Sequence, residues 1–163
     1  MAAQMKVLID PKEILQSANA ILLVDWPNPG VPRALLAAGL KVFSFCPNRY
    51  SAAEVLMERP LDVSEKSIFG PTSEGETGYL IFRQLGSRPA SVDIVNVYRP
   101  KEEFAAIVAN QVLALGAKVL WLHPPVQPGA ALEGRRLANE HGLVLVANAD
   151  IAEVARSIER NRG

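Results

Sequence analysis

Residues 20–49 carry the pattern that most constrains how this chain folds. Residues 21–24 form an apolar run, Ile-Leu-Leu-Val, which is too short for a helix and rich in strand-forming side chains, so we expect a strand buried on both faces. A turn rich in proline and glycine follows, then a short helix predicted over 33–38 that ends at Gly39, and a second strand predicted over 41–46. Two buried strands joined by a helix form a βαβ unit with a right-handed crossover. The pattern predicts an α/β protein.

The same alternation continues beyond this unit. Further strands are predicted over residues 92–97, 118–122 and 143–147, and helices over 11–18, 101–115, 129–141 and 151–160, with Asp10 and Asp150 as helix caps. Strands that alternate with helices predict a three-layer, Rossmann-like fold with a mostly parallel sheet of five or six strands. A chain of 163 residues without an internal repeat fits one core, so we expect residues 1–163 to form a single domain.

Residues 51–90 depart from this alternation. A helical turn is predicted over 52–57, and a short helix over 77–85. Between them, residues 62–76 have scattered charges and several glycines, which is typical of an irregular loop, with a short edge strand predicted at 67–69. A loop of this length in a compact domain is usually functional or mobile.

The charge and cysteine content exclude several function classes. The chain has 17 basic and 17 acidic residues, so it lacks the basic excess that nucleic acids and anionic membranes attract. No apolar run is long enough to span a bilayer and the start has no apolar signal core, so we expect a cytoplasmic protein. The single cysteine excludes an internal disulfide, and with only two histidines we expect no metal site. A net charge near zero mildly favours self-association, so we also expect a homodimer or a protein partner.

Polar residues follow four of the predicted strands. The carboxyl ends of parallel strands meet at one edge of the sheet, and ligands of such sheets bind beyond that edge. We therefore select as candidate ligand-binding residues those in the four strand-end turns: Asp25, Trp26, Pro27, Asn28, Gly30, Cys46, Pro47, Asn48, Arg49, Tyr98, Arg99 and His123.

Several of these candidates have both a functional and a structural interpretation. Asp25 is either a functional carboxylate or a turn-forming hydrogen bonder, and Trp26 either stacks on an adenine or is buried at the rim. Asn48 and Arg49 either contact a ribose or phosphate or form a plain turn. Cys46 has no adjacent base in the sequence, which favours an inert buried thiol.

The candidates that follow the later strands also have a functional and a structural interpretation. Arg99 either holds a phosphate or forms an ion pair, and His123 is either an acid–base group or a structural residue of a proline turn, while Tyr98 is expected to line the cleft.

The chain has no G-x-G-x-x-G after its first strand, no Walker lysine, no G-x-S-x-G elbow and no H-E-x-x-H. No nucleophile, base and orienting group come together, so we expect a protein without catalytic residues.

Five segments resemble a known family over about residues 14–155. They are Glu-Ile-Leu at 13–15 leading into 20–24, Pro-Asn-Pro-x-x-Pro at 27–32, Phe-Cys-Pro-Asn at 45–48, Val-Asp-Ile-Val-Asn-Val-Tyr-Arg at 92–99, and the helix end and strand at 113–122. In these segments the sequence is similar to the small CoA-binding-domain proteins, which are related to the CoA-binding half of succinyl-CoA ligase alpha subunits.

The resemblance implies a Rossmann-like protein that binds CoA at the strand ends, with NAD or another adenine nucleotide as the alternative ligand. Asp25 stands where that family usually carries a glycine, and the helix that follows is shorter than the family's. These departures favour a second hypothesis, a scaffold or regulatory module that kept the fold and lost the ligand. A third hypothesis is an enzyme that uses His123 and Asp25 on an unknown small substrate.

Overall fold

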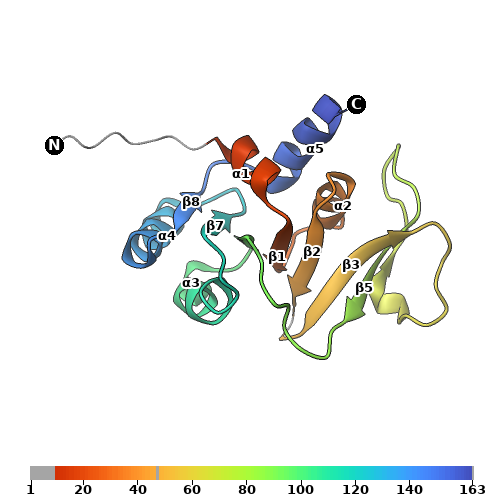
Figure 1. The fold of residues 1–163 in the computed structure, drawn as a ribbon, viewed down its shortest axis with the longest axis horizontal. Coiled ribbons are helices and arrows are strands. Elements are labelled where there is room, and N and C mark those ends of the chain that lie inside the picture. Colours follow the sequence, from red (N-terminus) through yellow and green to blue (C-terminus); the bar gives the residue numbers. More distant parts are fainter. Residues whose placement is uncertain (1–9, 47, 163) are drawn as a thin grey trace.

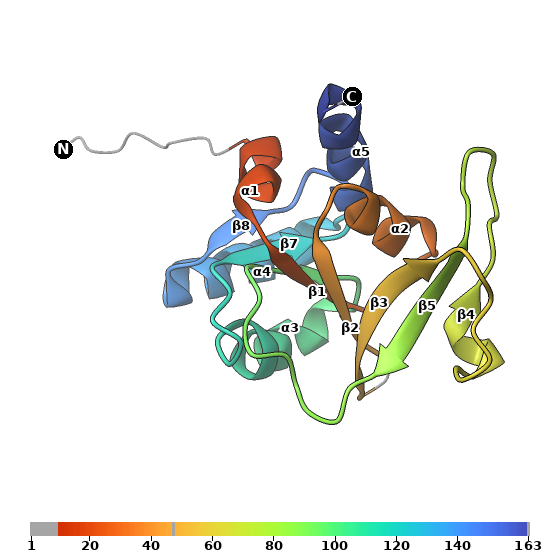
Figure 2. The same ribbon diagram turned by 45° about the vertical axis from the view of Figure 1, so that its right-hand side comes forward.

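The computed structural model describes residues 10–46 and 48–162, and the side chains of the last helix through Ile158. Within these residues the chain forms one mixed sheet with helices on both faces (Figures 1 and 2). The strands are β1 (Ala20–Val24), β2 (Lys41–Phe45), β3 (Tyr50–Leu56), β4 (Ile68–Phe69), β5 (Tyr79–Gln84), β6 (Ile94–Val97), β7 (Val119–Leu122) and β8 (Val144–Val146).

The strand order across the sheet is β4-β5-β3-β2-β1-β6-β7-β8. The pairs from β2 through β1, β6 and β7 to β8 are parallel, whereas β2–β3, β3–β5 and β4–β5 are antiparallel. The predicted α/β fold with a mostly parallel sheet is confirmed, and the parallel half is compatible with a Rossmann-like core. The described sheet has eight strands, so the predicted count of five or six was wrong.

The helices form the two outer layers. They are α1 (Pro11–Ser17), α2 (Gly30–Ala37), α3 (Phe104–Ile107), α4 (Pro128–His141) and α5 (Ile151–Arg162); α3 continues into a π-helical turn, η3 (Val108–Val112), and short 3-10 helices occur at η1 (Glu65–Ser67) and η2 (Lys101–Glu103). One core cluster packs α1, α2 and α5 on one face of the sheet, and a second packs α3 and α4 on the other. The helix predicted over 101–115 is therefore present, but in three segments of different hydrogen-bond pattern.

The central strand β1 shows why both faces need helices. Ile21 and Leu23 point into the core beneath α2 and α5, whereas Leu22 and Val24 point into the core beneath α3 and α4. All five residues of β1 are buried, as predicted for a strand covered on both faces.

Side chains cap the two helices for which a cap was predicted. The Asp10 carboxylate accepts a hydrogen bond from the Lys12 backbone N–H at 2.9 Å, and Asp150 does the same for Ala152 at 2.9 Å. Such caps stabilise a helix by about 1 kcal/mol each. Gly142 follows α4 in the left-handed conformation, with φ 67°.

The structure corrects two predicted helical segments. Most of residues 52–57 and 77–85 lies in strands β3 and β5, which pair with each other over six residue pairs, including Ala53 with Phe82 and Val55 with Leu80. Strand pairing and burial override weak helical preference in short segments such as these. The predicted edge strand at 67–69 is confirmed as β4.

Candidate functional site

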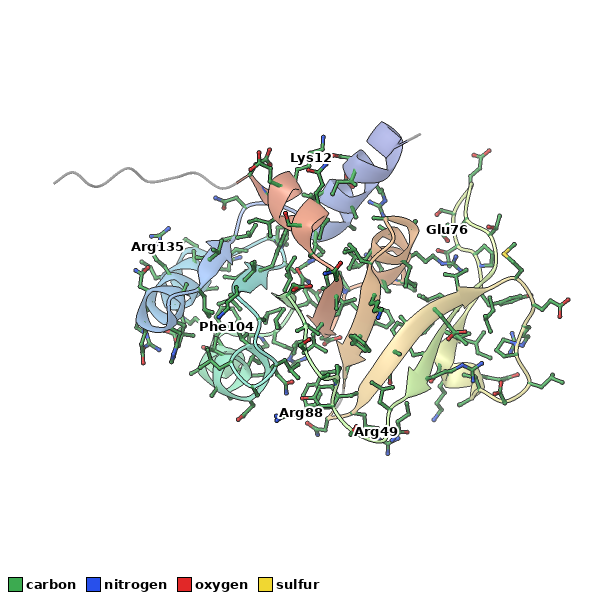
Figure 3. All side chains as sticks on the ribbon, viewed as in Figure 1. Lys12, Arg49, Glu76, Arg88, Phe104 and Arg135 are labelled. Carbon is green, nitrogen blue, oxygen red and sulfur yellow. The ribbon has the colours of Figure 1, made fainter. Side chains whose placement is uncertain are left out.

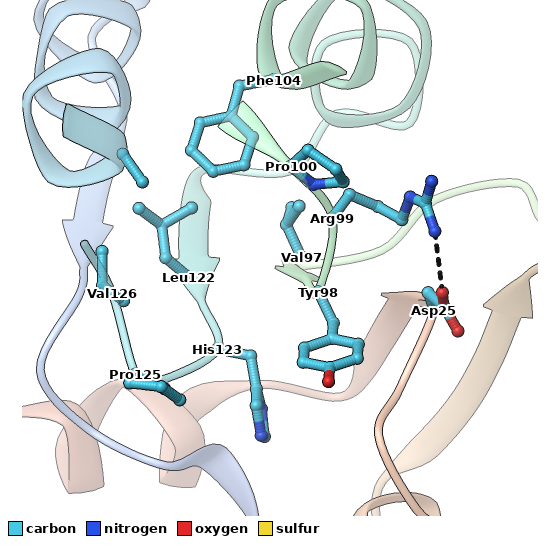
Figure 4. Close-up of a pocket in the computed structure, with 11 residues that line it drawn as sticks. Asp25, Val97, Tyr98, Arg99, Pro100, Phe104, Leu122, His123, Pro125 and Val126 are labelled. Carbon is cyan, nitrogen blue, oxygen red and sulfur yellow. Dashed lines mark hydrogen bonds and ion pairs between the residues drawn. The ribbon is translucent and has the colours of Figure 1, made fainter. Parts of the chain in front are cut away.

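The strand order places a crevice between β1 and β6. From β1 the chain continues to β2 on one side, and it later returns to β6 on the other, so the connections diverge at this point. In open α/β sheets the ligand crevice lies beyond the strand ends where the connections diverge. Asp25 follows β1 directly, and Arg99 comes two residues after β6. An ion pair of 3.1 Å joins Arg99 Nη1 to Asp25 Oδ2 across the crevice (Figure 4).

Asp25 has a backbone conformation that most residues avoid. Its φ is 64°, in the left-handed region that favours glycine, and aspartate is among the few other residues that tolerate it. Its Oδ1 accepts a hydrogen bond from the Trp26 backbone N–H at 2.8 Å, while its Oδ2 contacts Arg99. Asp25 is thus both a turn-forming hydrogen bonder and a charged group at the crevice.

Two carboxylates hold the Arg99 guanidinium. Its Nε and Nη2 donate to the two oxygens of Glu103 at 3.0 and 2.7 Å, and its Nη1 donates to Asp25 at 3.1 Å. These hydrogen bonds, first from Glu103 and then from Asp25, raise the pKa of Arg99, and Arg99 lowers the pKa of Glu103. The predicted alternative of an ion pair is confirmed, and a phosphate at Arg99 would compete with both carboxylates.

A cavity of about 300 Å³ adjoins this ion pair at the ends of β6 and β7. Its polar rim consists of Asp25, Tyr98, Arg99 and His123. Its walls are apolar and come from the strand ends, α3 and α4: Val97, Pro100, Phe104, Leu122, Pro125, Val126 and Ala130. An apolar cavity with a few polar groups is the usual form of a small-molecule site.

His123 and Tyr98 form one side of the rim. Their rings meet edge to face with centroids 5.5 Å apart, and in Figure 4 both side chains point away from Phe104. The His123 Nδ1 is buried and has no hydrogen-bond partner among the described residues. Burial lowers the pKa of His123, against a smaller opposite effect of Asp150, so the neutral imidazole predominates at neutral pH.

The comparisons with known proteins support the predicted family. The sequence profile of the CoA binding domain matches residues 25–156, which is most of the chain. This chain belongs to the CoA binding domain family. It is also similar to a Thermus thermophilus protein described as "The structure of cell-free ID.343", with a TM-score of 0.51 and 20% identity over 92% of this chain and 99% of that one. That likeness supports the fold. No curated protein matches the chain.

In this CoA binding domain protein, the turn after β1 packs an aromatic ring against the antiparallel strands and leads directly into α2. The Trp26 ring stacks on Phe82, with centroids 5.2 Å apart, and meets Phe69 edge to face at 5.5 Å. Trp26 is therefore partly buried in an aromatic cluster and is not among the residues that line the cavity. Asn28, next to Pro27, accepts a hydrogen bond from the Gly30 N–H at 3.0 Å, and α2 begins at Gly30 instead of the predicted residue 33.

The described residues of the turn after β2, Cys46, Asn48 and Arg49, are not among those that line the cavity. The Asn48 backbone is left-handed, with φ 62°, and Arg49 contacts Gln84 at 3.5 Å, so the plain-turn interpretation fits both residues. Figure 3 shows Arg49 well separated from Phe104 of the cavity wall. Pro47 was also selected from the sequence but lies outside the described residues.

Cys46 is exposed, so the prediction of a buried thiol was wrong. Its Sγ lies 3.5 Å from Asp25 Oδ1, beside the ion pair. Partial burial of the thiol, followed by the Asp25 carboxylate, raises the pKa of Cys46. A raised pKa leaves little thiolate at neutral pH, so low reactivity is still expected.

Two charged residues of this region were missed in the sequence. Glu103 stands four residues after Arg99, a spacing typical of ion pairs on helices that could have been noticed. Arg156 lies on α5, and its Nη2 would be 3.4 Å from a Cβ added at Gly30, so its guanidinium lies beside the first turn of α2. No local pattern connects residues 30 and 156.

A larger cavity of about 760 Å³ lies between α2, β3 and the loop at 73–77. The buried Arg33 at its edge donates to the backbone carbonyls of Phe69, Thr77 and Gly78 at 2.9–3.2 Å, which fixes the loop to α2. Arg33 is therefore structural.

Among the described residues, no group of His, Cys, Asp and Glu side chains could hold a metal ion, and no described helix has the length and apolar character needed to cross a membrane.

Proposed function

We propose that this protein binds CoA, or a related adenine nucleotide, at the carboxyl edge of its parallel strands. The observation that carries the proposal is the cavity beside the β1–β6 crevice in a member of the CoA binding domain family. CoA combines an uncharged pantetheine arm with a phosphate-bearing nucleotide. The apolar walls suit the arm, because they offer surface to bury and only a few polar groups to orient it.

The phosphate groups need a cation that is not already surrounded by carboxylates. Arg156 lies beside the first turn of α2, where it also lines the larger cavity. Its side chain is half-exposed, with a carboxylate partner, Glu153, at 3.0 Å. The α2 backbone itself offers little, because the N–H groups of Gly30, Val31 and Arg33 already have partners and Pro32 has none to donate. We therefore propose Arg156 as the phosphate-binding residue.

The proposed role is binding without catalysis. No described hydrogen bond connects the His123 side chain to a hydroxyl or thiol, and the Cys46 thiol contacts a carboxylate instead of a base. The nucleophile–base pair that covalent catalysis requires has therefore no counterpart among the described cavity residues.

Thermal unfolding with millimolar CoA, acetyl-CoA, NAD or ATP tests this proposal. A ligand at a hundred times its Kd adds about 2.7 kcal/mol of stability, which raises the Tm of a chain of this size by several degrees. We expect the rise with CoA compounds. Ala130→Phe, which fills the cavity, should abolish the rise, whereas Leu132→Phe at an exposed position of the same helix should retain it.

Other outcomes would redirect the proposal. A rise with NAD or ATP alone would keep the site and change its ligand. No rise with any of the four compounds would contradict nucleotide binding. That outcome would favour the alternative, a ligand-free scaffold or regulatory module, for which the pairing of Arg99 with both Asp25 and Glu103 is the structural argument.

A further inference from the structure

We propose that Asp25 is a specificity-determining residue that keeps the phosphate groups of the ligand away from the cavity rim and admits its uncharged part. This inference rests on the proposed function and adds to it a selection by charge at one end of the site. The inference is based on the charges around the β1–β6 crevice, where two carboxylates, Asp25 and Glu103, pair with one guanidinium, that of Arg99.

Three of the five N–H donors of Arg99 are already bound to carboxylates. Glu103 occupies Nε and Nη2, and Asp25 occupies Nη1. Two carboxylates around one guanidinium leave a net negative charge, which opposes an approaching phosphate. The Arg99 side chain is 38% exposed, so this repulsion acts through partly screening solvent.

The remaining rim groups do not offset this charge. The His123 imidazole is neutral at neutral pH, and the carboxylate near it, Asp150, adds a further negative charge while it caps α5. Tyr98 contributes a hydroxyl, which hydrogen-bonds to neutral groups as readily as to charged ones. An uncharged chain with amide groups, such as pantetheine, meets no repulsion at this rim.

The charge of Asp25 can be separated from its part in the turn. Asparagine also tolerates the left-handed conformation, and its side-chain oxygen can accept the same hydrogen bond from the Trp26 N–H. Asp25→Asn therefore removes the charge and keeps the turn. Asp62→Asn is the matched control, because Asp62 is an exposed carboxylate paired with an arginine, Arg83, on the antiparallel side of the sheet.

Calorimetric titration of the wild-type, Asp25→Asn and Asp62→Asn proteins with CoA and with pantetheine tests the inference. We expect Asp25→Asn to bind CoA about fivefold more tightly than the wild type, the effect typical of one partly exposed charge. Pantetheine affinity should not change, Asp62→Asn should match the wild type with both ligands, and high salt should reduce the gain for CoA.

The inference and the proposed function fail in different ways. If the wild type binds CoA and Asp25→Asn binds it equally or more weakly, the selection by charge is wrong and the proposed function stands. An equal gain for pantetheine would also overturn it, since pantetheine carries no phosphate. If none of the three proteins binds CoA or pantetheine, the proposed function is wrong and the inference falls with it.

Discussion

At the scale of single residues, the backbone of Asp25 gives a direct stability prediction. Asp25→Gly and Asp25→Ala both lose the ion pair with Arg99 and the hydrogen bond from the Trp26 N–H. They differ in the backbone, because alanine is strained at φ 64° and glycine is not. We expect Asp25→Ala to be less stable than Asp25→Gly by about 1 kcal/mol, measured by urea unfolding. Equal stability would show that the turn relaxes in the variants.

The same residue shows how far the sequence could be interpreted. Its position after a buried strand identified Asp25 as a candidate. The resembled family usually carries a glycine at this position, and the positive φ of Asp25 explains why, because glycine adopts that conformation without strain. Its partner could not be identified, because Arg99 is 74 positions away and only the pairing of β1 with β6 brings the two together. Burial of Cys46 was wrongly predicted for a related reason, since exposure at a strand end depends on what packs over it.

At the scale of elements, prediction succeeded where the pattern was local. The strands of the parallel half have apolar runs whose burial follows from the helices next to them in the chain. In contrast, β3 and β5 pair antiparallel across an intervening segment, and their residues 50–56 and 79–84 have no strict alternation to identify them. A pairing between distant segments decided their structure, and no local preference could indicate it.

The last helix allows a prediction about its cap. Asp150 accepts hydrogen bonds from the backbone N–H groups of Ala152 and Glu153 at 2.9 and 3.4 Å. Asp150→Ala leaves these donors without the carboxylate and should lower the free energy of unfolding by about 1 kcal/mol. Asp150→Asn can still accept the hydrogen bonds and should remain near the wild type. Urea unfolding should show a lower midpoint at unchanged slope for the alanine variant, and equal midpoints for the two variants would contradict the capping role.

At the scale of the whole molecule, the site is a product of topology. The ends of β1, β6 and β7 come from three separate stretches of the chain, and α3 and α4 close the cavity from one face of the sheet. The sequence could predict that these ends converge, because this follows from a parallel sheet. It could not predict that Asp25 would be a partner of Arg99, or that Arg156 would stand beside α2, since both depend on how distant segments pack together.

The pH dependence of global stability reports on the burial of His123. Its ordinary pKa of 6.5 is lowered in the folded protein, mainly by burial. Above that value the imidazole is neutral in both states and has no effect on the pH slope. As the pH falls below it, the unfolded chain takes up the proton first, so the free energy of unfolding decreases until the pH passes below the folded pKa.

We expect the wild type to lose stability relative to His123→Gln as the pH falls through this window. Urea unfolding of both proteins at a series of pH values measures the difference between their curves. Asp150→Asn should increase the loss, because the carboxylate of Asp150 opposes the lowering of the His123 pKa. If the wild-type and His123→Gln curves stayed parallel, the imidazole would be as accessible to protons in the folded protein as in the unfolded chain, which contradicts its burial at the rim.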